Sequence, residues 1–459
     1  MNMVLDILDS GAYSTLLLTT VAIAVLLDFL VNRAELVLAL ESRRNIKGGD
    51  SSPTTRTRTS EDDHVTQGDV LDRNDEKPED RKERPVKEFQ TSLVELSHLS
   101  ALTGRRIFAK CEYENPGESL KDRVANRLVA ECLRKGKTSL YEGTSGSTGV
   151  SLAKLCHEKN LECHLYVPDD CEKEKLNLMR QYNATVHLCK PTSYSSPEQY
   201  SQVCMRACKK AGAYFCDQFE NEVNWRDHYT ETGPEIWEQA KNLVRRERDE
   251  NRIAIPFDAF VMSAGTGGTI AGCGRYFKEQ SNNQTKVILA DPPGSSLQFK
   301  VQTNLCYNPE VEREGHRQQR IDDTIMEGFG LNRITKNFQK ALPFVDDAVS
   351  VSDEDAVLLC HYLRYVENHF CGSSSGAHLV ACLHAAAQLP ENAVICTVLC
   401  DSGERYRNRF WNHEVLKERG LLPPVFDVGE SADVEVDTEK LSSLVQQKFE
   451  AIFARTVHS

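Results

Sequence analysis

The sequence predicts an α/β protein with a parallel sheet, preceded by an N-terminal membrane-spanning helix. Two observations predict this class. From residue 91 onward, short apolar runs alternate with segments of helix length, which is typical of parallel α/β architecture. Residues 12–31 form a separate apolar run of about the 20 residues that a transmembrane helix needs. With 459 residues, the chain is long enough for two or three domains.

The composition narrows the class of protein further. Apolar residues make up 40% of the chain and charged residues 27%, as in a globular enzyme. A net charge of −13, without a basic stripe and interleaved aromatics, argues against a nucleic-acid partner. The 16 cysteines lie between Cys111 and Cys400 and form no C-x-x-C pair. We therefore expect reduced thiols, with no disulfide framework and no metal site.

The apolar run 12–31 predicts a membrane anchor within residues 1–44. The first eleven residues carry two acids and no base, unlike a secretory signal. The positive-inside tendency then predicts that the C-terminal side stays in the cytosol, because bases follow the run (Arg33, Arg43, Arg44 and Lys47). The structural alternative is an amphipathic or buried helix. Residues 45–88 are polar and charged, and we expect them to form a disordered linker.

The globular unit that follows is predicted to span residues 89–425, and 426–459 to form a C-terminal tail with a helix at Val436–Ala454. The apolar runs predict seven strands: Arg106–Cys111, Ser139–Tyr141, Cys163–Val167, Thr185–Cys189, Ala259–Ser263, Lys286–Ala290 and Ala393–Cys400. Motif-bearing turns are expected to open helices at Asp122–Arg134, Val150–Lys159, from Ile270, and at Ala377–Leu389.

The turn Asn115–Arg123 (NPGESLKDR) presents a lysine at the start of a helix. Pro116 presets φ and Gly117 tolerates the conformation that follows, so the chain enters the helix in a fixed way. A lysine held at a defined height can act as a Schiff-base nucleophile when its amine is unprotonated. Taken alone, Lys121 is equally a solvated charge at a helix start.

Two further turns have the chemistry of anion sites. Thr144–Gly149 (TSGSTG) combines hydroxyls and glycines at a helix start, which suits a carboxylate. Gly265–Thr269 (GTGGT) follows a strand and opens a helix, so N–H groups, the helix dipole and two hydroxyls converge on one phosphate. The second turn lacks a Walker lysine and dinucleotide spacing, which favours a phosphate on a small cofactor. Each is otherwise a polar strand–helix turn.

Two serine-rich turns complete the set. Gly372–Ala377 (GSSSGA) opens a helix and Asp401–Tyr406 (DSGERY) follows a strand. We expect both to place hydroxyls at the carboxyl ends of strands, where open α/β sheets bind ligands. Either could be an ordinary loop with a helix cap. Five such turns in one α/β unit, one with a lysine and one with a phosphate cradle, predict a pyridoxal-phosphate site.

These turns, together with DQFENEVNWRDHYTETGPEIWEQ at residues 217–239, occur in the order seen in the cysteine synthase / cystathionine β-synthase family. The resemblance covers residues 90–415. It implies the two-domain fold-type II (tryptophan synthase β-like) fold of pyridoxal-phosphate enzymes, with a smaller mobile subdomain at about 130–240. The anchor and the serine in TSGSTG resemble most the fungal-type cysteine synthase 2 group, which resides at mitochondrial membranes.

Carried over to this sequence, the resemblance implies that Lys121 holds pyridoxal 5'-phosphate covalently. Ser374 would face the ring nitrogen, and the phosphate would bind Gly265, Thr266, Gly267, Gly268 and Thr269. Ser147 stands where the family usually has an asparagine beside the 3'-oxygen of the cofactor. A shorter hydroxyl there implies a bridging water or a tilted cofactor.

The substrate carboxylate would bind Thr144, Ser145, Thr148 and Gln218. The implied reaction is L-cysteine synthesis from O-acetyl-L-serine and sulfide. Cystathionine formation from serine and homocysteine, serine/threonine dehydration, and a membrane-tethered pseudoenzyme that senses sulfide are the alternatives. Only 53 residues follow Tyr406, too few for a paired nucleotide-binding module, and no haem-binding segment is evident, which favours the simpler synthase. The resemblance also implies a homodimer, at the mitochondrial outer membrane with its catalytic unit facing the cytosol.

Overall fold

The computed structural model describes residues 89–192, 196–245, 255–307, 324–427 and 435–457. The predicted anchor at 12–31 and the linker at 45–88 lie outside these residues. Within the described ranges, no helix is both long and apolar enough to cross a bilayer. The contact pattern separates Met1–Glu83 from a second unit, Arg84–Ser459, and the fold described below belongs to the second unit.

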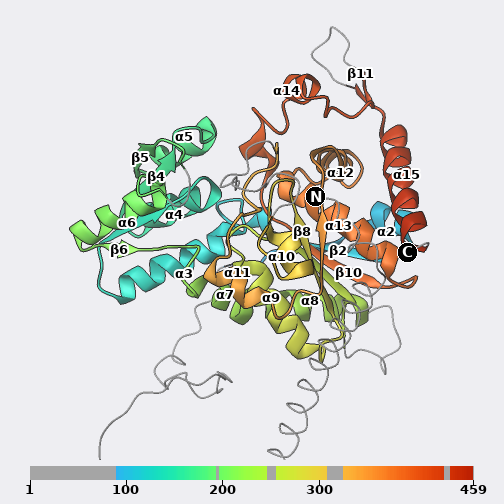
Figure 1. The fold of residues 1–459 in the computed structure, drawn as a ribbon, viewed down its shortest axis with the longest axis horizontal. Coiled ribbons are helices and arrows are strands. Elements are labelled where there is room, and N and C mark those ends of the chain that lie inside the picture. The colour runs from blue at the N-terminus through green and yellow to red at the C-terminus, as the bar shows by residue number, and fades with distance from the viewer. Residues whose placement is uncertain (1–88, 193–195, 246–254, 308–323, 428–434, 458–459) are drawn as a thin grey trace, which may run out of the picture. The chain divides into compact units, whose positions relative to one another are not determined.

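The larger sheet has six strands in the order β1-β2-β10-β7-β8-β9 (Figure 1). All neighbours are parallel except β1 and β2, as predicted for parallel α/β architecture. Its strands are β1 (Leu93–Glu95), β2 (Arg106–Cys111), β7 (Ala259–Ser263), β8 (Lys286–Asp291), β9 (Asp347–Ser350) and β10 (Val394–Leu399).

Helices cover both faces of this sheet, so its central strands are almost fully buried. In β2, Ile107 and Ala109 enter one buried cluster, shared with α12 and α13, whereas Phe108 enters another, shared with α8 and α9. Burial on both sides explains why the strands appear in the sequence as continuous apolar runs and not as alternating ones. The covering helices are α8 (Gly233–Arg245), α9 (Gly268–Gln280), α12 (Asp353–Tyr365) and α13 (Ser373–Gln388).

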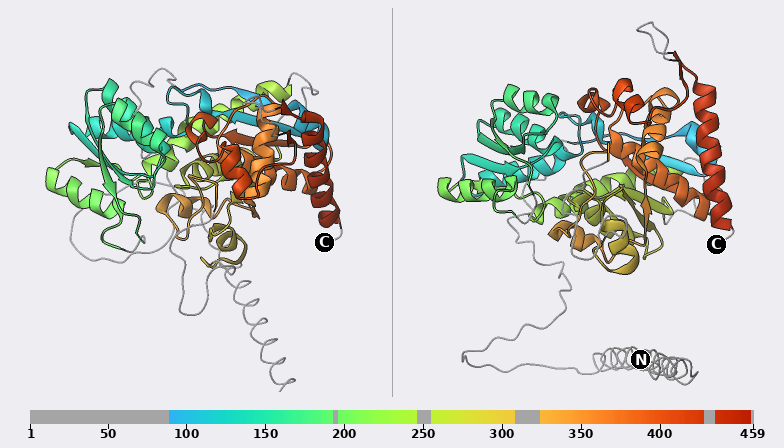
Figure 2. Two further views of the ribbon diagram at one scale, coloured as in Figure 1. Left: turned by 90° about the horizontal axis from the view of Figure 1, so that it is seen from above. Right: turned by 45° about the horizontal axis from the view of Figure 1, so that its top comes forward.

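A second, parallel sheet of four strands lies in a separate lobe, with the order β5-β4-β3-β6 (Figure 2). Its core joins Val124, Leu152, Leu165 and Leu176, from three helices and a central strand. Helix α6 packs on the strands through Cys204 and Cys208. The elements are β3 (Ser139–Gly143), β4 (Glu162–Pro168), β5 (Thr185–Cys189), β6 (Tyr214–Phe215), α3 (Lys121–Arg134), α4 (Ser147–Glu158), α5 (Lys173–Gln181) and α6 (Tyr200–Ala211).

The remaining elements connect or flank the two sheets. Helix α15 (Thr438–Val457) packs against α12 and α13. The others are α2 (Ser97–Thr103), η3 (Glu112–Glu114), α7 (Val223–Asp227), η4 (His228–Thr232), α10 (Leu297–Thr303), α11 (Lys336–Ala341), η6 (Gly403–Tyr406), α14 (His413–Glu418), β11 (Phe426–Asp427) and β12 (Glu435–Val436). All 16 cysteines are free, as expected for reduced thiols.

The structure differs from the predicted elements at several helix starts, at the GSSSGA turn and at some short strands. Helices α4, α9 and α13 begin at Ser147, Gly268 and Ser373, within the motifs and not after them. The turn GSSSGA does not follow a strand, because it lies between α12 and α13. It still reaches the carboxyl end of β10, since Cys371 forms an isolated bridge with Ser402. Strands β1, β6 and β9 were not predicted, as they have only two to four residues.

Candidate active site

The lysine turn is fixed against the carboxyl end of β10. The Leu120 N–H donates to the Cys400 carbonyl at 2.7 Å, and Ser119 forms an antiparallel bridge with Asp401. The Ser119 hydroxyl accepts the backbone N–H of Lys121 at 3.2 Å, at the first residue of α3. The turn NPGES therefore places Lys121 beside DSGERY, although Lys121 and Asp401 lie 280 positions apart in the sequence.

The charge of Lys121 affects the pKa values of three buried groups, His228, His378 and Cys400. Burial is the main cause of the lowered pKa of His228 and His378, to about 3 and about 4, and the Lys121 charge lowers both further. Burial also raises the pKa of the Cys400 thiol, to about 12, and Lys121 opposes that shift. Contacts of the neighbouring residues place the Lys121 turn against the carboxyl end of β10.

The GTGGT turn is a tight cradle at the start of α9. A Cβ on Gly265 would lie 2.3 Å from the Gly328 carbonyl oxygen, and one on Gly268 would lie 2.0 Å from the Asn224 side chain. Gly267 has φ +86°, a left-handed conformation that favours glycine, and it caps the helix. The Thr335 hydroxyl donates to the Thr266 carbonyl at 2.7 Å. The glycines therefore let neighbouring groups pack closely around the first turn of α9, where the Gly268 N–H donates to the Thr266 hydroxyl at 3.4 Å.

Two neutral histidines support this cradle. The Ser263 N–H donates to His378 Nε2 at 2.9 Å, and His378 Nδ1 donates to the Val398 carbonyl at 2.7 Å. Nε2 of His228 contacts the Thr269 hydroxyl at 3.2 Å. Their low pKa values keep both imidazoles uncharged at neutral pH, so they hold the loop in place without competing for an anion.

Ser374 lies in the first turn of α13, with 9% of its surface exposed. Its hydroxyl is close enough to Cys400 to affect the pKa of that thiol by hydrogen bonding, alongside the dominant effect of burial. Neighbouring Ser375 accepts the Cys400 N–H at 3.3 Å, which ties α13 to β10. The predicted ring partner, Ser374, and the predicted covalent residue, Lys121, therefore both lie beside Cys400.

The TSGSTG turn lies at the carboxyl end of β3 and opens α4. The Thr148 hydroxyl donates to Gln218 Oε1 at 2.7 Å, which brings together two of the four predicted substrate residues. Thr144 is also buried and its hydroxyl accepts the Gly146 N–H at 3.3 Å, whereas Ser145 is exposed. The turn thus has buried hydroxyls beside a buried amide, a suitable set of groups for a carboxylate.

Ser147, in the first turn of α4, hydrogen-bonds to the DSGERY turn. Its hydroxyl donates to Asp401 Oδ2 at 3.2 Å, and the Tyr406 hydroxyl donates to the same oxygen at 2.6 Å. This contact joins the smaller lobe to the DSGERY turn. Asp401 was quoted within its motif, but sequence analysis gave it no role.

Asn224 joins the carboxylate region to the phosphate cradle. Its Nδ2 donates to the Gln218 carbonyl and to the Thr266 hydroxyl, each at 2.9 Å. The Asn337 side chain also donates to the Gln218 carbonyl, at 3.0 Å. Asn224, His228 and His378 were all missed as site residues. The first two lie in the motif at residues 217–239, and that motif was the only signal that could have indicated them.

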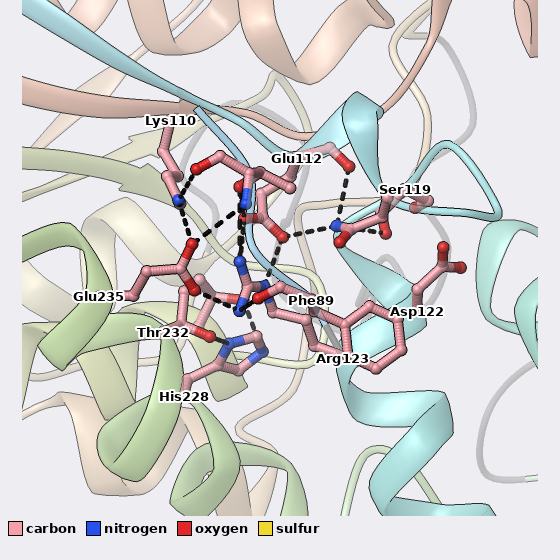
Figure 3. Close-up of polar contacts among 12 residues, drawn as sticks. Phe89, Lys110, Glu112, Ser119, Asp122, Arg123, His228, Thr232 and Glu235 are labelled. Atoms are coloured by element: carbon pink, nitrogen blue, oxygen red, sulfur yellow. Dashed lines mark hydrogen bonds and ion pairs between the residues drawn. The ribbon is translucent and has the colours of Figure 1, made fainter. Parts of the chain in front are cut away.

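Four buried charged side chains form a cluster at the first turn of α3: Lys110, Glu112, Arg123 and Glu235 (Figure 3). Arg123 donates to Glu112 at 2.7 Å and to Glu235 at 2.9 Å. Lys110 donates to Glu235 at 2.5 Å. Burial alone would raise the pKa of Glu112, but the charge and hydrogen bonds of Arg123 lower it to about 2. Two cations therefore balance two anions inside the protein, two residues beyond Lys121.

The cluster also fixes the lysine turn itself. The Asn115 side chain donates to Glu112 Oε2 at 2.8 Å and to the Ser119 carbonyl at 3.1 Å. Arg123, Glu112 and Asn115 thus connect helix α3 with both ends of the turn that precedes it. Since Lys121 lies between these fixed points, its backbone position depends on the cluster.

Residues 86–401 match the family described as "Pyridoxal-phosphate dependent enzyme". The chain belongs to this family. Its cofactor is pyridoxal phosphate. The residues fit that group, since the Gly265–Thr269 turn is closely packed glycine backbone at a helix start, and the Lys121 turn and the start of α13 both bond to Cys400. The roles of the single residues remain those that the resemblance predicts.

Several cysteine and cystathionine synthases are similar to this enzyme. Cysteine synthase 2 of Neurospora crassa is 38% identical, over 76% of this chain and 75% of its own length. A Saccharomyces cerevisiae protein provisionally named as a mitochondrial cysteine synthase is 40% identical, over 70% of this chain and 81% of its own length. Cystathionine beta-synthase of Apis mellifera is 31% identical, over 73% of this chain and 62% of its own length.

A solved structure shares the fold. The crystal structure of O-ureido-L-serine synthase superposes with a TM-score of 0.58 at 24% identity, covering 75% of this enzyme and 94% of that chain. At this level of identity, the likeness shows the fold alone. It agrees with the α/β fold of type II pyridoxal-phosphate enzymes that the motifs predicted.

Proposed function

We propose that the enzyme makes L-cysteine from O-acetyl-L-serine and sulfide by replacing the acetoxy group at Cβ. The observation that carries the proposal is that the Lys121 turn and the start of α13, which carries Ser374, both hydrogen-bond to Cys400 at the end of β10. The cysteine synthase names of relatives at 38–40% identity support the same activity. These residues hold an amino acid over a phosphate-anchored cofactor, with one amine available for proton transfer.

Each group has a defined task in this reaction. Pyridoxal phosphate, when bound, supplies the electron sink that acidifies the α-C–H bond of the substrate and lets the β-substituent leave. Lys121, released when the amino acid takes its place, removes the α-proton and later returns it. Thr148 and Gln218 orient the substrate carboxylate. Ser374 would be a neutral hydrogen-bonding partner for the ring nitrogen of the cofactor, which would make the ring a weaker electron sink than a charged partner does.

The choice of substrates is tested by comparing two substrate pairs on the purified full-length enzyme. We expect kcat/KM with O-acetylserine and sulfide to exceed that with serine and homocysteine by at least about tenfold, a difference of about 1.4 kcal/mol in transition-state binding. Faster turnover of serine with homocysteine would assign the enzyme to cystathionine formation. No turnover with either pair would favour the pseudoenzyme alternative.

We also propose that residues 12–31 attach the enzyme to a membrane with residues 89–425 in the cytosol, and that this membrane is the mitochondrial outer membrane. The apolar run and the bases after it support the orientation, and the mitochondrial name of one relative supports the location. The homodimer implied by the resemblance is part of the same proposal.

Deletion of residues 1–44 tests the anchor. Because the fold described above begins after residue 88, we expect the shortened enzyme to be soluble and to keep its kcat within about twofold. The measurement is sedimentation of both forms with membranes after carbonate washing, with activity recorded in each fraction. A shortened enzyme that still sediments with washed membranes would overturn the proposal.

A further inference from the structure

A buried carboxyl group lies directly behind the Thr148–Gln218 pair. Glu142, in β3, is 1% exposed, and its Oε1 accepts the Gln218 Nε2–H at 2.9 Å. Its Oε2 is buried and has no hydrogen-bond partner among the described residues. Glu142 thus ends a relay of three side chains that runs from the strand core to the hydroxyl of Thr148.

The surroundings of Glu142 do not favour a negative charge. The groups that face it, from β4, α6 and the segment after β6, are Cys163, Tyr200, Cys204, Cys216 and Asp217. Asp217 is the charged member of this set, and its charge has the same sign as that of an ionised Glu142. A buried carboxylate without a cation is costly, and protonation removes that cost.

The direction of the Gln218 amide depends on this proton. An amide has a donor end and an acceptor end, whereas an ionised carboxylate only accepts. In the present arrangement Gln218 Nε2 faces Glu142, so Gln218 Oε1 faces Thr148 and accepts a hydrogen bond from its hydroxyl. Both groups would then offer oxygen lone pairs to a carboxylate, which requires donors. With the amide turned around, Nε2 and the Thr148 hydroxyl would be free to donate to that carboxylate.

We propose that the enzyme binds substrate with Glu142 protonated. Glu142 then donates to Gln218 Oε1, which turns Gln218 Nε2 and the Thr148 hydroxyl toward the substrate carboxylate. Glu142 is a positioning residue in this scheme, since it acts through Gln218. If ionised beforehand, it takes one proton from solvent as the substrate binds, and no other bond changes. The inference rests on the proposed function, which places the amino-acid carboxylate at Thr148 and Gln218.

The electrostatics support the proton. Burial, followed by the charge of Asp217, raises the pKa of Glu142 to about 8, although hydrogen bonds from the side chain and backbone of Gln218 and from the backbone of Asp217 oppose the shift. The carboxyl is therefore mostly neutral at pH 7. Above about pH 8 it ionises, and its charge then repels the substrate carboxylate in a site of low dielectric. Substrate affinity should therefore fall as the pH rises through this value.

The test is a titration of the cofactor-loaded enzyme with L-serine, followed by the absorbance of the cofactor and not by turnover. Between about pH 7 and about pH 9, we expect the dissociation constant of the wild type to rise about tenfold more than that of Glu142→Gln, whose amide can donate at every pH. The amine of serine titrates alike in both, so the comparison isolates Glu142. Glu162→Gln, an exposed change on neighbouring β4, should keep the wild-type profile.

Serine methyl ester, which has no carboxylate, provides the matched control ligand. Because its amine titrates alike with both proteins, the wild type and Glu142→Gln should give the same pH profile with the ester. Equal pH profiles of the two proteins with serine, or an equally large difference between them with the ester, would overturn the role of Glu142. If no amino acid changed the absorbance at any pH, the proposed function itself would be wrong, and the two failures are therefore distinguishable.

Discussion

Replacing Lys121 by alanine is expected to lower kcat by at least about 10³-fold, because the substitution removes both the covalent holder of the cofactor and the group that moves the α-proton. The measurement is cysteine formation from O-acetylserine and sulfide at saturating cofactor. The fold should persist, since Lys121 is only partly buried at the first residue of α3. Thermal unfolding of the variant should therefore stay close to that of the wild type.

Lys154→Ala is the matched control for this experiment. Lys154 lies on α4 and donates to the Pro116 carbonyl in the same turn, so its loss perturbs the neighbourhood without removing the proposed reacting amine. We expect its kcat to stay within a few-fold of the wild type. Similar activity in Lys121→Ala and the wild type would refute the assignment of the site.

Removing one charge from the buried cluster should cause the largest loss of stability. Arg123→Met leaves Glu112 and Glu235 buried with only Lys110 as a cation. Breaking a buried ion pair from one side costs about 3–5 kcal/mol, because the remaining charge stays desolvated. The measurement is the free energy of unfolding from a denaturant titration, with the cofactor at equal concentration in both proteins.

Lys241→Met provides the comparison on the same helix as Glu235. Lys241 pairs with Glu238 at 3.0 Å, but both side chains are exposed, at 36% and 63%. Exposed pairs contribute about 0–1 kcal/mol, so we expect a small change. Equal destabilisation by the two substitutions would mean that burial does not determine the strength of the cluster. The buried cluster would then have no special role in holding the turn before Lys121.

Much of the fold was predictable because the central strands are buried on both faces. Arg106–Cys111 and Ala259–Ser263 were predicted with the bounds that the structure has, as was the partly exposed edge strand Thr185–Cys189. Buried strands appear as short continuous apolar runs between turns, a local signal. Helix starts were harder, because Ser147 and Gly268 have low helix propensity and were assigned to loops, whereas tertiary packing places them in the first turn.

The residues of the site also fall into two groups: those that local sequence signals marked and those that only the fold reveals. Turn chemistry marks Lys121 and Gly265–Thr269 locally, through proline, glycine and hydroxyl residues at fixed spacing. Glu142, Asn224 and His378 carry no such signal, since their roles arise from contacts between segments far apart in the sequence. His378, for example, supports Ser263 across 115 residues. Buried polar partners of this kind are visible only once the fold brings the segments together.

The central claim is that Lys121 holds the cofactor. Reduction of the cofactor-loaded enzyme with borohydride fixes the linkage, and mass spectrometry of the peptides then identifies the modified lysine. The account predicts one pyridoxyl group per chain, on Lys121, and its loss when O-acetylserine is added before reduction. Modification of a different lysine, or none in an enzyme that is active and saturated with cofactor, would contradict it.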